Sequence, residues 1–184
     1  MLRQAASRSN ATRYTTPSRV RKPASRSRRS GYALITPSLK LRKYTDEDVE
    51  KLFRLDEQCF PLPFRFSLEA MRRFASSSKA FVPMAEMDGE LVGFVILHVE
   101  GTAGYIVTLD VAEAYRRKGI AQALMQQVEA HAREAACEVL VLHVFDRNQS
   151  AIAFYDHAGF EEVDRDENFY GEGLHALVYR RLLT

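Results

Sequence analysis

The stretch VAEAYRRKGIA, residues 111–121, decides the fold of this chain. It joins the apolar segment 105–111, which predicts a strand, to the amphipathic segment 120–135, which predicts a long helix. Such a loop presents backbone N–H groups to an anion, and Gly119 lets a pyrophosphate approach the backbone closely. Three basic residues precede this glycine in the loop: Arg116, Arg117 and Lys118. The stretch predicts a strand–loop–helix unit that binds phosphate, although an ordinary basic helix start would carry the same charges.

The sequence around this unit alternates between helix and strand signals. An Asp88-Gly89 pair marks a tight turn between two strands, and Gly159 ends a helix. In chain order we expect a strand at 39–44, helices at 46–59 and 68–76, strands at 80–87, 91–99 and 105–111, a helix at 120–135, a strand at 139–145, a helix ending at 157, and a β pair near 161–164 and 174–182. This order predicts an α/β domain with a mixed central sheet and helices on both faces.

The charge of the chain is divided unevenly along its length. Residues 1–45 contain 12 Lys and Arg and no Asp or Glu, whereas the remainder holds 14 basic and 24 acidic residues, a net charge of −10. Residues 1–37 have no apolar period, so we expect a disordered basic extension before a catalytic domain at 38–184. Two other interpretations remain open for the extension: an arm attracted to the ribosome or to nucleic acid, and an organelle transit peptide.

Several classes of protein are disfavoured by what the sequence lacks. No apolar run approaches the ~20 residues that span a membrane. Cys59 and Cys137 have no metal-ligand spacing, so we expect reduced thiols, no metal and a cytoplasmic location, with organelle import still open. The glycine patterns of P-loop and dinucleotide-binding proteins are absent from the sequence. We expect a monomer.

The loop resembles a known motif once its neighbours are considered. Residues 111–121 are similar to the acetyl-CoA pyrophosphate loop of the GNAT superfamily of N-acetyltransferases, Gln/Arg-x-x-Gly-x-Gly/Ala. Arg116, Gly119 and Ala121 occupy its fixed places, and alanine is an allowed variant at the last of them.

A second GNAT signature follows at the expected distance. The segment NQSAIAFY, residues 148–155, and then Gly159-Phe160, resemble Asn-x-x-Ala-x-x-Phe-Tyr followed by Gly-Phe. The resemblance covers about residues 38–184 and implies a GNAT (acyl-CoA N-acyltransferase) fold, with acetyl-CoA as co-substrate. It implies that the cofactor contacts Leu109, Asp110, Val111, Arg116, Arg117, Lys118, Gly119, Ile120, Ala121, Asn148 and Tyr155.

Acetyl transfer to an amine needs a base, donors for the thioester oxyanion and an acid for the leaving thiolate. Backbone N–H groups at the strand end 109–111 are candidate oxyanion donors. His143 lies in the otherwise apolar strand 139–145, where composition alone favours a structural histidine bonded to a backbone carbonyl.

The resemblance reverses that interpretation of His143. The segment Leu142-His143-Val144 and the strand that begins at Tyr105 resemble eukaryotic N-terminal acetyltransferase E catalytic subunits, in which such a His and Tyr act as a pair through an ordered water. The related bacterial ribosomal-protein-alanine acetyltransferases carry Glu at the position of the histidine. Tyr155 is the implied acid for the leaving thiol.

The same resemblance implies an acceptor groove. Phe60-Pro61-Leu62-Pro63 is similar to a Phe-Pro-Val loop that holds the first residue of the peptide, and Asn168-Phe169-Tyr170 to an Asn-Tyr-Tyr segment that binds its backbone. Phe169 lacks the hydroxyl, which removes one such hydrogen bond. The implied substrate-binding residues are Phe60, Pro61, Leu62, Tyr105, Phe169 and Tyr170.

Proton chemistry favours an α-amine over a lysine as acceptor. An α-amine with a pKa of about 7.8 is roughly a tenth neutral at pH 7, whereas a lysine near 10.4 is neutral in only about 0.04% of molecules. We therefore expect an N-terminal α-amine acetyltransferase of the ribosomal-protein-alanine type, with a protein or peptide N-terminus as partner. The alternatives are acetylation of a small amine, such as a polyamine or aminoglycoside, and a non-catalytic acetyl-CoA-binding module.

Overall fold

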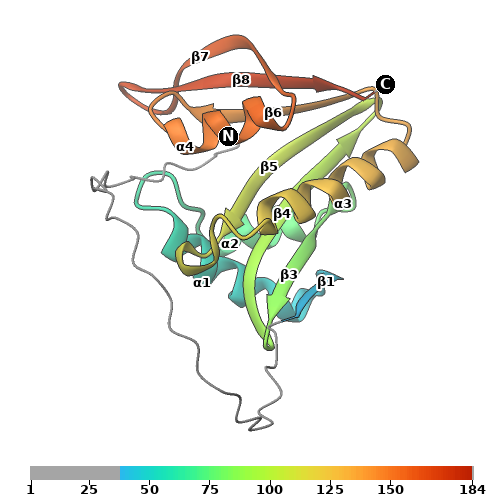
Figure 1. Ribbon diagram of the computed structural model, residues 1–184. Helices are drawn as coiled ribbons and strands as arrows, with labels where there is room; N and C mark the ends of the chain where they lie inside the picture. Colours follow the sequence, from blue (N-terminus) through green and yellow to red (C-terminus); the bar gives the residue numbers. More distant parts are fainter. Residues whose placement is uncertain (1–37, 184) are drawn as a thin grey trace, which may run out of the picture.

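The computed structural model describes residues 38–183, so the expectations for the basic extension, residues 1–37, lie outside the described residues. Figure 1 shows a twisted mixed sheet with helices packed against it. The strands and helices are β1 (Leu39–Lys43), α1 (Val49–Cys59), α2 (Leu68–Ala75), β2 (Ala80–Phe81), β3 (Pro83–Met87), β4 (Glu90–Glu100), β5 (Ala103–Val111), α3 (Ile120–Glu134), β6 (Val139–Phe145), α4 (Gln149–His157), β7 (Glu161–Gly171) and β8 (Leu174–Leu182). No helix within this part of the chain is long and apolar enough to cross a membrane.

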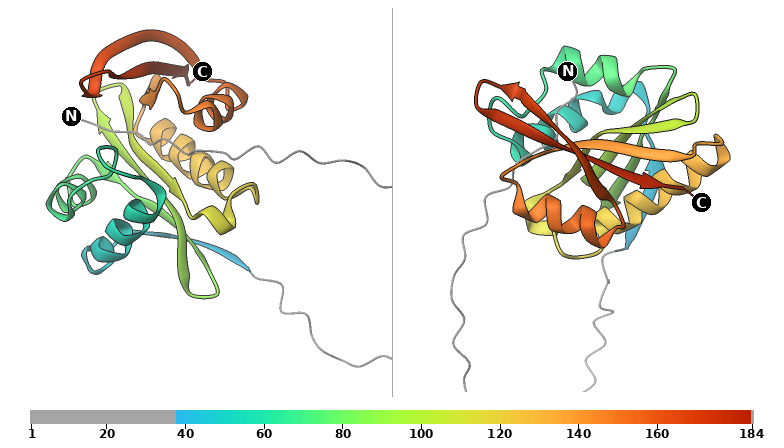
Figure 2. Two further views of the ribbon diagram at one scale, coloured as in Figure 1. Left: turned by 90° about the vertical axis from the view of Figure 1, so that its left-hand side faces the viewer. Right: turned by 90° about the horizontal axis from the view of Figure 1, so that it is seen from above.

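The sheet has the strand order β1-β3-β4-β5-β6-β8-β7, and β2 pairs separately with β4. Among the described strands, β5 and β6 alone run parallel, because α3 forms the crossover between them. Figure 2 shows α1 and α2 on one face of the sheet and α3 on the other. The predicted mixed α/β architecture with helices on both faces is confirmed.

Three expected elements differ in detail. The strand expected at 80–87 divides into β2 and β3, because Pro83 donates no hydrogen bond and therefore begins a strand. The helix expected from Asp46 starts as a 3-10 turn, and α1 begins at Val49. The strand β7 extends to Gly171, well beyond the expected end at 164, because its exposed polar residues carry no hydrophobic signal.

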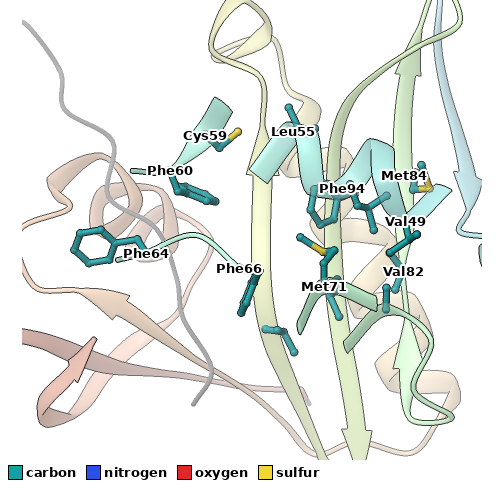
Figure 3. Close-up of a cluster of buried hydrophobic side chains, with 14 of the residues drawn as sticks. Val49, Leu55, Cys59, Phe60, Phe64, Phe66, Met71, Val82, Met84 and Phe94 are labelled. Carbon is teal, nitrogen blue, oxygen red and sulfur yellow. The ribbon is translucent and has the colours of Figure 1, made fainter. Parts of the chain in front are cut away.

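Two apolar cores lie on opposite faces of the sheet. One contains Leu52, Met71 and Phe94, and joins α1, α2 and the loop between them to β3 and β4, as Figure 3 shows. The other contains Leu124 and Val128 from α3 and packs α3 and α4 against the opposite face. Each helix is therefore held by the sheet, and the loops at the sheet's centre are positioned from both sides.

Strands β5 and β6 separate after a short region of pairing. Their partners run from Ala103↔Val139 to Ile106↔Leu142, and beyond these four pairs the strands diverge, as Figure 1 shows. The divergence leaves a split in the middle of the sheet. Open strand ends at such a split are where α/β proteins commonly bind ligands.

A β-bulge changes the direction of side chains along β5. On β4, Ile96 and Leu97 are adjacent, but their partners on β5 are Thr108 and Ile106, so Val107 is an extra residue. After the bulge, the odd-numbered side chains of β5 point to the opposite face of the sheet, so Leu109 packs on the α3 side. The side chain of Asp110 consequently faces α1.

Gly93 lets β4, the end of β5 and the start of α3 pack closely together. A Cβ atom at Gly93 would lie 2.9 Å from the Asp110 carbonyl oxygen and 3.1 Å from Ile120 Cγ2. The backbone carbonyl cannot move without disturbing the end of β5. Gly93→Ala should therefore be destabilising by about 1–3 kcal/mol, a fall in Tm of roughly 2–12 °C, measured by thermal unfolding.

Gly104→Ala provides a contrast for this prediction. Its added Cβ would meet the tips of Leu140 and Leu97, which can shift, so the fall in Tm should be smaller. An unchanged Tm for Gly93→Ala would contradict this account of the packing.

Candidate active site

The loop between β5 and α3 has the geometry of an anion site. Gly119 is the N-cap of α3 with φ +80°, a conformation that other residues adopt only under strain, and Arg117 also has positive φ at 60°. The Arg116 Nε donates to the Val111 carbonyl oxygen at 3.0 Å and braces the loop against the end of β5. A Cβ at Gly119 would meet no atom within 4 Å, so the space beside the helix start is open.

A cavity of about 500 Å³ lies beside this loop. Nine of the eleven residues predicted to contact the cofactor line it: Leu109, Val111, Arg116, Arg117, Gly119, Ile120, Ala121, Asn148 and Tyr155. Open space at Gly119, free N–H groups expected at a helix start and two arginines suit a pyrophosphate, so these residues fit acetyl-CoA.

Two of the eleven residues are placed differently from the expectation. The Asp110 side chain is fully buried on the α1 side of β5, away from the cavity, because of the bulge. The Lys118 Nζ lies over the Tyr115 ring, 4.9 Å from its centroid. Only the backbone of Asp110 remains a candidate for cofactor contact.

Asn148 and Tyr155 enter the cavity from α4. Asn148 is the N-cap of that helix, and its side chain accepts a hydrogen bond from the Ala151 N–H at 3.2 Å. Tyr155 is buried, and its ring packs edge-on against Phe154 and Phe160. Capping and packing hold both groups in place, and the role of Tyr155 as the acid for the leaving thiol stays a prediction.

Tyr105 and His143 are in direct contact across the split. The Tyr105 hydroxyl and His143 Nδ1 are 2.5 Å apart. In the β5–β6 register Tyr105 pairs with Val141, so His143 lies two residues farther along β6 on the same face. The resemblance implies a pair linked by an ordered water. The register instead brings the two side chains within direct hydrogen-bond distance.

A carboxylate faces the other nitrogen of the imidazole. Asp166 Oδ2 on β7 lies 3.6 Å from His143 Nε2, and this carboxylate favours a proton on Nε2. With the proton there, Nδ1 accepts a hydrogen bond from the Tyr105 hydroxyl. Burial lowers the pKa of His143, and Asp166 opposes that shift. Burial and the charge of Asp166 both raise the pKa of Tyr105, so its phenol is protonated at neutral pH.

Sequence reasoning missed Asp166. It belongs to an acidic, exposed run on β7, where nothing in the pattern distinguishes one carboxylate from the next. Asp166 and Phe169 are three residues apart, so regular strand alternation would place them on opposite faces. The ladder is irregular between Asp166 and Gly171, where Asn168 has φ 56°, and both side chains reach the histidine.

The predicted aromatic residues of the hairpin surround His143. The Phe169 ring stacks on the imidazole with centroids 4.2 Å apart and an interplanar angle of 6°. Tyr170 is buried, and its hydroxyl donates to the His143 carbonyl oxygen at 3.3 Å. In this structure both residues support the histidine, and their contact with a peptide stays a prediction.

The predicted acceptor loop contacts both the cavity and the aromatic residues of the β7–β8 hairpin. Phe60 follows α1 directly and lines the cavity, whereas Leu62 is 70% exposed. Phe64 packs against Phe145 at 4.7 Å and Tyr170 at 5.2 Å between ring centroids. The loop therefore joins the cavity, through Phe60, to the aromatic residues of the hairpin, through Phe64, and it exposes the apolar side chain of Leu62.

The remaining side chains show no metal centre. Within residues 38–183, no group of three or more His, Cys, Asp and Glu could hold a metal ion. Cys59 and Cys137 are both buried as free thiols, and burial raises the pKa of Cys59 to about 12.

Comparison with known proteins agrees with this geometry. The model of the acetyltransferase (GNAT) family matches residues 49–160. The chain is 30% identical over 141 residues to the N-alpha-acetyltransferase of Sulfurisphaera tokodaii, which covers 68% of this chain and 82% of that protein. It is 29% identical over 161 residues to the histone acetyltransferase MCC1 of Arabidopsis thaliana, with 74% of this chain and 65% of that protein covered.

A solved structure gives a similar result. The crystal structure of Arabidopsis thaliana NAA60 in complex with a bisubstrate analogue aligns with a TM-score of 0.70 and 27% sequence identity. The alignment covers 79% of this chain and 98% of that chain.

The anion site predicts a graded response at Gly119. Gly119→Glu should abolish acetyl-CoA binding, because a carboxylate would project from the helix start toward the pyrophosphate. Gly119→Ala should weaken binding less, since its Cβ meets open space and only the positive φ is strained. Isothermal titration calorimetry measures both affinities, and an unchanged affinity for the glutamate variant would refute the loop assignment.

The contact between Asp166 and His143 predicts a shift in the pH–rate profile. A base must be neutral, so kcat/KM should rise through the pKa of His143, which burial places below its usual value of about 6.5. Asp166→Asn removes the charge that opposes this shift, and the acidic limb should move to still lower pH. Asp164→Asn, on the same strand, is the matched control and should leave the limb in place. An upward shift, or equal shifts for both variants, would contradict the assignment.

Proposed function

The chain belongs to the acetyltransferase (GNAT) family, and we propose that it transfers the acetyl group of acetyl-CoA to the N-terminal α-amine of a protein or peptide. As a member of that family it is an acetyl-CoA-dependent enzyme. The observation that carries the proposal is the 2.5 Å contact between Tyr105 and His143, on the acceptor side of the split. The N-alpha-acetyltransferase of S. tokodaii and NAA60 support the same substrate class.

The Tyr105–His143 pair suits the removal of a proton from an amine. Burial keeps His143 neutral at pH 7, so its Nδ1 is free to take a proton. The Tyr105 oxygen accepts the amine proton while the phenol passes its own proton to His143 Nδ1. Asp166 then faces the imidazolium that results and stabilises its charge.

The cavity side of the split provides the remaining groups. Acetyl-CoA, when bound, supplies the acetyl group as an activated thioester. Backbone N–H groups at the end of β5, near Leu109 and Val111, are placed to stabilise negative charge on the carbonyl oxygen. Tyr155 lines the same cavity and is the candidate donor of a proton to the leaving sulfur.

The acceptor side favours a chain terminus over a compact cation. The acceptor loop exposes Leu62, and Phe169 lies against His143, so the first side chain of a peptide could bury apolar area there. An α-amine is also neutral a few hundred-fold more often than a lysine at pH 7. Because the chain is also similar to a histone acetyltransferase, lysine is the competing acceptor that the experiment must test.

The substrate class can be tested with a panel of acceptors. Incubation with acetyl-CoA should place the acetyl group on residue 1 of unblocked peptides, as located by fragment mass spectra. N-blocked peptides with internal lysines, and spermidine, should give far lower kcat/KM. Comparable values for either would overturn the proposal.

Variants of the catalytic pair provide the control for that panel. His143→Ala and Tyr105→Phe should each lower kcat by about 10²–10⁴-fold, the usual effect of losing a general base. Acetyl-CoA affinity should stay near the wild-type value, because neither residue lines the cavity. A folded His143→Ala enzyme with normal kcat would place the base elsewhere.

A further inference from the structure

Two carboxyl groups that the proposed mechanism does not use are completely buried. Asp56 on α1 and Asp110 on β5 are both 0% exposed. Asp56 Oδ2 accepts the Phe66 backbone N–H at 2.8 Å, and Asp110 Oδ1 accepts the Thr108 hydroxyl at 2.5 Å. The second oxygen of each, Asp56 Oδ1 and Asp110 Oδ2, has no hydrogen-bond partner among residues 38–183. Buried polar atoms without a partner are rare in folded proteins and call for a physical explanation.

The two carboxyls lie where the functional segments meet. The bulge at Val107 turns Asp110 toward α1, and α1 ends three residues after Asp56, just before the acceptor loop begins at Phe60. Asp56 also closes that loop at both ends, because its carbonyl oxygen accepts the Phe60 N–H and its carboxyl accepts the Phe66 N–H. Asp56 therefore fastens the loop that carries Leu62 to α1, and the charge of Asp110 on the catalytic strand acts on the same carboxyl.

Full ionisation of both carboxyls would be unfavourable. Around Asp56 the charged neighbours are Arg65 and Glu57, and around Asp110 they are Arg116 and the Asp56 carboxyl itself. The thiol of Cys59, which also lies near both, is neutral. Arg65 pairs with Glu57, and Arg116 Nε is bonded to the Val111 carbonyl oxygen. Two buried negative charges would repel each other with only partial compensation.

We propose that Asp56 and Asp110 are positioning residues, and that they hold the acceptor loop against β5 only while the pair carries a proton. The protonated carboxyl supplies the donor that both unpartnered oxygens lack. When the proton leaves, like charges face each other across the α1–β5 contact, and the loop loses its fixed position over the split. This inference rests on the proposed function for its kinetic consequence alone.

The sign of the stability effect follows from the same groups. Burial raises the pKa of Asp56 to about 7, and burial together with the charge of Asp56 raises the pKa of Asp110. The folded chain thus binds a proton that the unfolded chain has lost above about pH 4. The free energy of unfolding should fall as pH rises from about 4 through the pKa of the pair.

The kinetic test compares Asp56→Asn with wild type across the pH range. The asparagine keeps an acceptor for the Phe66 N–H and supplies a permanent N–H donor toward Asp110, so it imitates the protonated pair. The ratio of kcat/KM, variant over wild type, cancels the titration of the substrate amine. This ratio should stay near one at about pH 6 and rise by about tenfold for each pH unit above the apparent pKa of the pair. The rise should come from a peptide KM that increases with pH in wild type but not in Asp56→Asn. The acetyl-CoA KM should be unaffected.

Control variants separate positioning from a general loss of structure. Glu50→Gln, an exposed carboxylate on the same helix, should give a flat ratio. Asp56→Ala leaves the buried Phe66 N–H unsatisfied and should raise the peptide KM at every pH. A flat ratio for Asp56→Asn would overturn the proposal, and it would indicate that both carboxyls stay ionised or that the loop does not depend on them.

Thermal unfolding provides a readout that does not depend on the substrate. The wild-type Tm should fall relative to that of Asp56→Asn as pH rises from about 4, and the difference should level off above the pKa of the pair. If no peptide is acetylated but the two Tm curves diverge, the proposed function is wrong and the proton shared by Asp56 and Asp110 is supported. If peptides are acetylated but the two Tm curves run parallel, the proton-dependent pair is wrong and the proposed function stands.

Discussion

The early end of the β5–β6 pairing is the constraint on which the rest of the structure depends. Four residue pairs join these two parallel strands, and beyond Ile106 and Leu142 the backbone groups of both strands are free of each other. The split separates an anion-binding loop and cavity on the α3–α4 side from an aromatic acceptor side on the α1–β7 side. If β5 and β6 were paired along their whole length, neither the cavity side nor the aromatic side would have an open strand end.

The bulge in β5 gives this single strand two separate roles. Before Val107, Tyr105 faces the acceptor side and meets His143. After it, Leu109 and Val111 line the cavity, while Asp110 turns toward α1 and the acceptor loop. One extra residue thus places the proposed proton-transfer residue Tyr105, a cavity wall and a buried carboxyl on different surfaces of the same strand.

The histidine of the site is positioned almost entirely by side chains from distant segments. Phe169 stacks on its ring, Tyr170 bonds its carbonyl oxygen, and Asp166 and Tyr105 face its two ring nitrogens. Because Phe169, Asp166 and Tyr105 meet different sides of the imidazole, orientation, charge and tautomer are controlled separately. The long β7–β8 hairpin supplies three of these four partners.

By itself, the sequence determined the α/β architecture, the strand–loop–helix unit ending at Gly119 and the residues near it, because hydrophobic periodicity, capping and glycine conformation are local properties. It also indicated His143 and Tyr105, through a resemblance rather than through their chemistry. Only the tertiary structure decided that these two side chains touch, that Asp166 faces the imidazole, and that Asp110 turns away from the cavity to meet Asp56. Each of these depends on strand register, on a bulge or on hairpin twist, and such features are set by pairing between segments far apart in the chain, so no local pattern encodes them.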